Sequence, residues 1–132
     1  MSKLIYPGLV ALLLALTSCE GETTYLKRVE NRSNYPISIA FEAVMTGESD
    51  TVYIDPHTSE TVYVTYQRGG NDSPHSCLQE MDNITVITED SLHVTRDITD
   101  ASNWDQQITS SNKLGNTVQQ LCLFVLDDED FE

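Results

Sequence analysis

Ile37-Ser38-Ile39-Ala40-Phe41-Glu42 is the stretch that decides the fold class of this chain. Its large apolar side chains recur at every second position, and the polar Ser38 lies between two of them. A period of two is the period of a β-strand, and a single apolar face indicates a strand half buried against a core. The sequence therefore predicts a β protein around this strand.

Similar patterns before and after this stretch predict further short strands, separated by turns that contain Gly, Pro, Asn or Asp. The predicted strands cover residues 25–30, 37–42, 51–54, 61–66, 83–88, 92–96 and 118–126. We expect two hairpins, which pair 51–54 with 61–66 and 83–88 with 92–96. In 61–66, Val62 and Val64 are expected to share one face.

About seven short strands, with turn signals roughly every eight to twelve residues, predict an all-β fold. We expect an antiparallel β-sandwich of the immunoglobulin-like kind, with a flattened β-barrel as the alternative. Segment 97–116 shows no clear period, and we expect Trp104 and Ile108 to anchor it to the core. The chain shows no internal repeat and no second domain, so the predicted sandwich occupies residues 25–132.

The charge of the chain restricts its partners. The sequence has 132 residues with 7 Lys and Arg against 21 Asp and Glu, a net charge of −14. Such a field repels phosphate backbones, which excludes nucleic acid as a partner. The acidic run at 127–132 is expected to be a solvated tail, because it lacks the spacing of a calcium-binding loop.

Cys77 and Cys122 would be the natural pair for a disulfide if the domain is exported from the cytoplasm. Such a bridge would contribute about 4 kcal/mol at most. Two buried free thiols are the alternative. A zinc site is a weaker hypothesis, since the cysteines and histidines lack a known ligand spacing, and we expect no metal.

No catalytic constellation is recognisable in the sequence. The chain has no nucleophile elbow, no zinc-protease motif and no phosphate-binding glycine loop, so we predict neither enzyme activity nor a cofactor. The histidines, His57, His75 and His93, are expected to be solvated surface residues.

Aromatic residues suggest one binding hypothesis. Tyr53, Tyr63 and Tyr66 lie on neighbouring predicted strands and, with Trp104, could form a carbohydrate-binding platform. Cross-strand tyrosine packing and a core role for Trp104 are the structural alternatives, and both are common in β-sheets.

The N-terminal residues carry the most specific motif. Lys3 precedes an apolar region at 4–16, which is too short for a bilayer span of about 20 residues. The ending Leu16-Thr17-Ser18-Cys19 resembles a bacterial lipoprotein lipobox. This resemblance implies that residues 1–18 are a signal peptide and that Cys19 carries acyl chains anchoring the protein to a membrane. Ordinary secretion, with cleavage nearby, is the alternative.

In outline the whole chain is similar to the small uncharacterised lipoproteins of Bacteroidetes-type bacteria. The shared features are the lipobox, a polar tether at 19–24, a β-rich domain and the acidic ending Phe124–Phe131. The resemblance implies an outer-membrane lipoprotein of the cell envelope, on either the periplasmic or the surface side. It also suggests O-glycosylation at Thr51 and Ser91, which sit in Asp-Ser/Thr-apolar patterns.

From these features we expect a non-enzymatic interaction or structural module with an unknown protein or glycan partner. A glycan-binding accessory lipoprotein of the cell surface is the alternative.

Overall fold

The computed structural model describes residues 21–89, 91–111 and 117–132. Within these ranges the protein is all-β, and its only helices are two single 3-10 turns, Ala101–Asn103 and Asp128–Asp130. Seven strands form two sheets, as expected for a β-sandwich. They are β1 (Glu22–Asn31), β2 (Ile37–Ala43), β3 (Ser49–Ile54), β4 (Thr58–Arg68), β5 (Met81–Thr88), β6 (Trp104–Ser111) and β7 (Thr117–Leu126).

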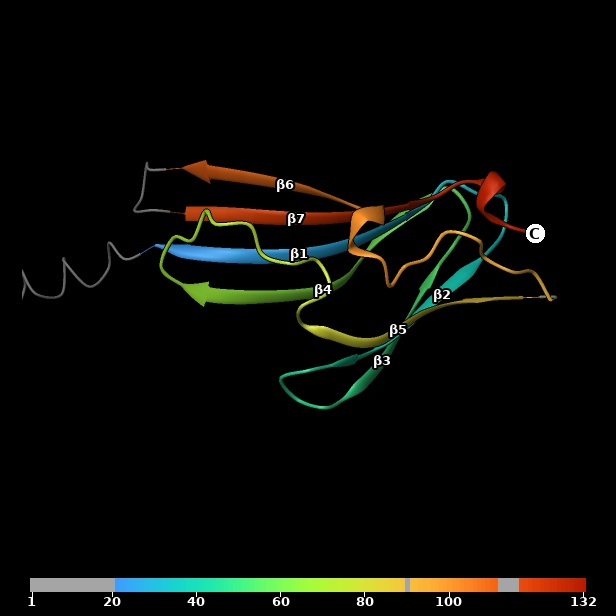
Figure 1. The fold of residues 1–132 in the computed structure, drawn as a ribbon, viewed down its shortest axis with the longest axis horizontal. Helices are drawn as coiled ribbons and strands as arrows, with labels where there is room; N and C mark the ends of the chain where they lie inside the picture. The colour runs from blue at the N-terminus through green and yellow to red at the C-terminus, as the bar shows by residue number, and fades with distance from the viewer. Residues whose placement is uncertain (1–20, 90, 112–116) are drawn as a thin grey trace, which may run out of the picture.

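The two sheets differ in size (Figure 1). The larger sheet has the strand order β4-β1-β7-β6, and the smaller has the order β3-β2-β5. Among the described residues no strand pair joins one sheet to the other, so the sheets do not close into a flattened barrel. The larger sheet is not fully antiparallel, because β1 and β7 pair in parallel from Glu22↔Thr117 to Asn31↔Leu126. These strands are far apart in the sequence, so no tight turn restricts their relative direction.

Both expected hairpins are wrong. β3 pairs with β2 in the smaller sheet and β4 pairs with β1 in the larger sheet, so the turn at 55–57 carries the chain from one sheet to the other. Residues 92–96 form no strand, since Val94 makes a single isolated bridge with Phe131 instead. Residues 92–96 thus pair with the carboxyl-terminal residues, whereas β5 was their expected partner.

Two further details differ from expectation. β6 was missed because residues 105–111 are polar except for Ile108. Ile108 is exposed and does not anchor the segment to the core, whereas Trp104 is buried as expected. In β4 the register with β1 shifts so that Val62 is an extra residue without a partner. This bulge places Val62 in the core and leaves Val64 opposite Leu26 on the other face.

The apolar core lies between the smaller sheet and one half of the larger sheet. It is formed by Val29, Ile37, Ile39, Phe41, Ile54, Trp104, Phe124 and Leu126, among others. The alternation of Ile37, Ile39 and Phe41 in β2 is thus confirmed as the buried face of that strand.

The acidic run is not a loose tail. Residues 128–130 form a 3-10 turn with a capping box, in which the Asp130 carboxylate accepts a hydrogen bond from the Asp127 amide at 2.8 Å. The following Phe131 packs its ring on Tyr35, with 5.1 Å between centroids. Glu132 and His93 exchange two backbone hydrogen bonds of 2.8 and 2.9 Å.

Candidate functional site

The inner face of the larger sheet is polar over half its length. In β1 the buried positions are Thr23, Tyr25, Lys27, Val29 and Asn31, and in β7 the buried Gln120 stands opposite Tyr25. The smaller sheet covers the end near Val29. The other half is covered by residues 69–80, here called the strap, which link β4 to β5 without regular secondary structure (Figure 1).

The strap needs hydrogen-bond partners because it brings irregular backbone against a sheet. Gln120 supplies three of them. Its amide nitrogen donates to the carbonyls of Asn71 and Ser73 at 3.0 and 2.9 Å, and its oxygen accepts from the His75 amide at 3.1 Å. Gln106 of β6 adds a hydrogen bond to the His75 carbonyl at 2.6 Å.

β1 holds the first part of the strap. The Thr23 hydroxyl donates to the Gly69 carbonyl and accepts from the Asn71 amide, both at 2.7 Å. The Tyr25 hydroxyl accepts from the Asn71 side chain at 3.1 Å. The Gly69 amide also donates to the Gly21 carbonyl at 3.1 Å, which ties the strap to the start of the described chain.

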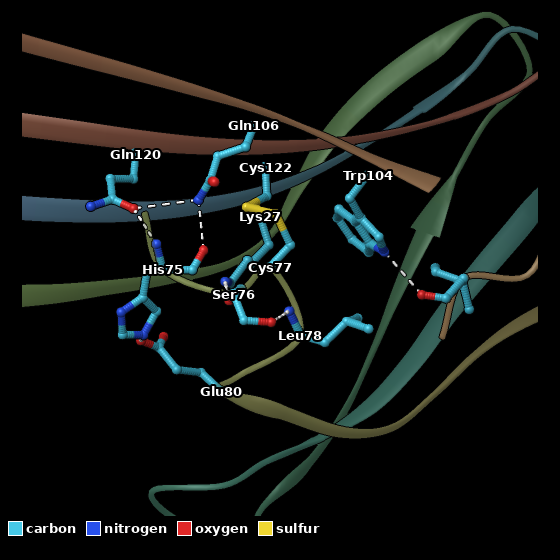
Figure 2. Close-up of a disulfide and its surroundings, with 11 residues drawn as sticks. Lys27, His75, Ser76, Cys77, Leu78, Glu80, Trp104, Gln106, Gln120 and Cys122 are labelled. Atoms are coloured by element: carbon cyan, nitrogen blue, oxygen red, sulfur yellow. Dashed lines mark hydrogen bonds and ion pairs between the residues drawn. A yellow bond between two sulfur atoms is a disulfide. The ribbon is translucent and has the colours of Figure 1, made fainter. Parts of the chain in front are cut away.

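A disulfide fastens the other part of the strap to β7 (Figure 2). It joins Cys77 to Cys122, whose Cα atoms are 5.6 Å apart, and confirms the predicted bridge. Both cysteines are buried. Beside them Lys27 donates from Nζ to the Ser76 carbonyl at 3.2 Å, so a lysine and a disulfide hold consecutive strap residues.

Lys27 is a basic side chain that is almost completely buried. Only 1% of its surface is exposed, and burial lowers its pKa below the usual 10.5, while the nearby Glu80 carboxylate opposes part of that shift. Glu80 also accepts a hydrogen bond from the Thr65 hydroxyl and lies 3.3 Å from Nε2 of His75. These contacts link the second half of the strap, through His75, Ser76 and Glu80, to one group of charges.

His75 departs from its expected place at the solvated surface. Its ring lies on Tyr25, with centroids 4.5 Å apart, and its side chain is 21% exposed. His57 and His93 are exposed as expected, and His57 contacts the Asn34 side chain at 2.8 Å.

The four candidate aromatic residues do not form one platform. Trp104 is buried, its ring nitrogen donates to the Ile98 carbonyl at 2.9 Å, and its ring packs on Phe124. Tyr53 and Tyr66 are both exposed, but they belong to different sheets. Tyr63 is partly buried and meets Phe41 edge to face at 5.6 Å.

Tyr63 and Phe41 line a groove of about 430 Å³. The groove opens between β4 and the loop from β2 to β3, where it is also lined by Thr46, Glu48, Ser49 and Asp50. It offers aromatic surface beside hydroxyl and carboxylate groups. Of the four candidate aromatics, Tyr63 is the one that contributes to this groove.

The remaining candidates lie on the surface or outside the description. Thr51 is exposed in β3, and Ser91 is exposed in a turn with a left-handed φ of 60°. Cys19 lies outside the described residues. Within the described ranges, no group of three or more His, Cys, Asp or Glu side chains could hold a metal ion.

Sequence reasoning missed the polar residues that hold the strap. Thr23, Lys27 and Gln120 look like surface residues by type. The sequence does carry one signal for them, which is their position in the strand alternation. Lys27 lies two residues from both Tyr25 and Val29, and Gln120 lies two residues from both Val118 and Cys122, so each shares a face with buried neighbours. In comparisons with protein-family models, curated proteins and solved structures, nothing matches this chain.

Proposed function

We propose that this protein is a lipid-anchored lipoprotein of the cell envelope whose β-sandwich acts as a non-enzymatic interaction or structural module. The observation that carries the proposal is the sequence Leu16-Thr17-Ser18-Cys19 after a short apolar region. Its lipobox-like spacing makes Cys19 the residue that would receive the acyl chains. Two or three chains would hold the protein on the membrane essentially permanently, at about 0.8 kcal/mol for each buried CH₂.

The fold is compatible with such an anchor. β1 begins at Glu22, so residues 22–24, expected in the tether, belong to the sheet. The chain between Cys19 and Glu22 reaches about 10 Å when extended, at about 3.5 Å per residue. In the described part of the protein, no helix has the length and apolar character needed to cross a bilayer.

The disulfide supports a place outside the cytoplasm, because such bridges persist in oxidising compartments. The negative charge supports a partner other than nucleic acid. We propose the outer membrane as the location. Protease added to intact cells distinguishes its surface side, where the protein is cleaved, from its periplasmic side, where it survives.

Metabolic labelling with an alkyne fatty acid tests the anchor. We expect the wild-type protein to take up the label and the Cys19→Ala variant to lose it and leave the membrane fraction. Ser18→Ala is the matched control, since it keeps a small residue before the cysteine and should be labelled normally. An unlabelled wild-type protein, or label that survives Cys19→Ala, refutes the proposal.

The groove at Tyr63 favours a second candidate, a glycan-binding accessory lipoprotein. Aromatic rings beside carboxylates and hydroxyls are suited to the apolar face and hydroxyl groups of a sugar. A glycan array with the chain from Glu20 onward tests this candidate. Glu48→Gln and Asp50→Asn should weaken binding with little change in shape, whereas Tyr66→Ala, outside the groove, should not. A blank array refutes it.

A further inference from the structure

We propose that the Cys77–Cys122 disulfide is a redox latch, whose reduction detaches the strap from the larger sheet and exposes Lys27 while both sheets stay folded. The proposal concerns the strap alone and holds with or without a lipid on Cys19.

The strap is attached covalently to β7 by the bridge, and its other attachments are non-covalent. Its sequence, Gly69-Gly70-Asn71-Asp72-Ser73-Pro74-His75-Ser76-Cys77-Leu78-Gln79-Glu80, contains Cys77 and Leu78 as its buried or partly buried apolar residues. The remaining ties are mostly hydrogen bonds that strap residues make with Thr23, Tyr25, Lys27, Gln106 and Gln120. When the strap opens, water replaces these bonds, so each adds little net stability. The covalent bond is the one restraint on this irregular segment that water cannot replace.

The sheets do not depend on the bridge in the same way. Cys77 and Cys122 pack in the apolar core and Leu78 packs against it, but most core residues come from the strands themselves, among them Val29, Ile39 and Ile54. β1 is paired with β4 and β7 along its whole length. A segment with few apolar contacts beside a well-paired sheet opens locally, at a lower free energy than global unfolding.

Lys27 favours the open state once the latch is released. The closed strap removes the Lys27 ammonium from water, and a single strap carbonyl, that of Ser76, accepts a hydrogen bond from it. Opening restores hydration to this charge, whereas the Gln120 amide exchanges its strap partners for water. The strap remains connected at Arg68 and Met81, so it can close again when the bridge re-forms.

The chemical step is a thiol–disulfide exchange with a dithiol reductant. The dithiol gives up two electrons and two protons and becomes a cyclic disulfide. The Sγ–Sγ bond of Cys77 and Cys122 breaks, and each sulfur leaves as a thiol with one of those protons.

Hydrogen exchange with mass spectrometry tests the latch on the purified protein, with and without dithiothreitol. In parallel, acetic anhydride labels accessible lysines, and guanidinium-unfolded protein sets the full extent of Lys27 modification. We expect reduction to remove the protection of residues 69–80 and to make Lys27 as reactive as in the unfolded reference. The strands β1, β2 and β7 should keep their protection.

The Cys77→Ala, Cys122→Ala double variant repeats the measurement without reductant, which separates loss of the bridge from effects of the reagent. It should match the reduced wild-type protein. Two outcomes overturn the proposal. If the strap stays protected and Lys27 stays unreactive in both samples, the polar ties suffice to hold it. If all strands lose protection together, the bridge stabilises the whole fold and is not a latch.

Discussion

Asn31 is a fully buried polar residue that organises the turn between β1 and β2. Its amide nitrogen donates to the carbonyls of Tyr35, Ile54 and Asp55 at 2.7, 3.4 and 3.3 Å. Its oxygen accepts from the amide and hydroxyl of Ser33 at 3.1 and 2.6 Å. The one side chain thus joins the first turn to the end of β3, in the other sheet.

We expect Asn31→Ala to lower the free energy of unfolding by about 2–4 kcal/mol, because several buried groups lose their partner at once. Urea denaturation checks this value. Asn34→Ala is the matched control in the same turn, since its bonds to Asp128 are exposed, and it should cost less than about 1 kcal/mol. Equal losses for the two variants would contradict the role given to Asn31.

Lys27 makes stability depend on pH. Burial lowers its pKa in the folded state, against an ordinary value of 10.5 in the unfolded chain. Between those two values the unfolded state binds more protons, so the free energy of unfolding contributed by this residue rises with pH. We expect the wild-type protein to gain stability in the alkaline range below pH 10.5, relative to Lys27→Met.

The measurement is the difference between the two unfolding free energies, followed from neutral to alkaline pH. Arg28→Met is the control because Arg28 is an exposed cation on the opposite face of β1. It should leave the slope as in the wild type. If the unfolding free energy of Lys27→Met had the same pH slope as that of the wild type, burial would not lower the pKa of this lysine.

At the scale of the elements, strands with an apolar period of two could be predicted from the sequence. Ile37, Ile39 and Phe41 define β2 without any knowledge of its neighbours, and the apolar run 121–126 fits the central position of β7. Pairing could not be predicted in the same way. β3 and β4 follow each other closely in sequence, yet the turn between them connects the two sheets. No local sequence pattern distinguishes this turn from a hairpin turn.

β6 and residues 92–96 show two opposite errors: β6 is a strand that was not predicted, and 92–96 is a predicted strand that does not form. Seven of the eight residues of β6 are exposed, and this strand has no apolar face. Its backbone pairing with β7 holds it in the sheet. Residues 92–96 alternate well but meet the carboxyl-terminal residues instead of a sheet. Alternation reports which side chains are buried, whereas strand formation depends on which backbone lies beside them.

The carboxyl-terminal turn therefore contributes to stability as an element. We expect Phe131→Ala to lower the free energy of unfolding by about 1–3 kcal/mol, because its partly buried ring packs on Tyr35 and the core. Amides of His93 and Thr95, which pair with this segment, should exchange faster. Glu129→Ala, at an exposed position of the same turn, is the control, and an equal effect there would contradict this packing role.

At the scale of the whole molecule, the larger sheet is longer than the apolar core it helps to build, and the strap completes its cover. The sequence permits the disulfide to be predicted, because two cysteines in a domain that the lipobox-like motif predicts to be exported have few alternatives. It does not reveal the site around the disulfide. Lys27, Gln120 and Glu80 become neighbours only when β1, β7 and the strap converge, and polar side chains are ordinarily expected to face water.

The proposed anchor also predicts how the molecule stands on a membrane. Glu22 of β1 lies beside Arg68 and Thr117, and Asn31 at the other end lies beside Thr58 and Leu126. A strand of this length spans about 30 Å at about 3.3 Å per residue. A lipid on Cys19 would place the first end against the bilayer, and the strongly negative charge of the chain would keep the rest away from anionic headgroups.

We therefore expect the acylated protein, in nanodiscs with headgroup spin-labelled lipids, to show graded paramagnetic broadening. Amide signals of Glu22, Arg68 and Thr117 should broaden most, because they lie closest to the anchor, and those of Asn31 and Thr58 should stay sharp. Cys19→Ala protein mixed with the same nanodiscs is the control and should show no gradient. Uniform broadening along β1 would mean that the sandwich lies flat on the membrane, and the reverse gradient would place the anchor at the other end.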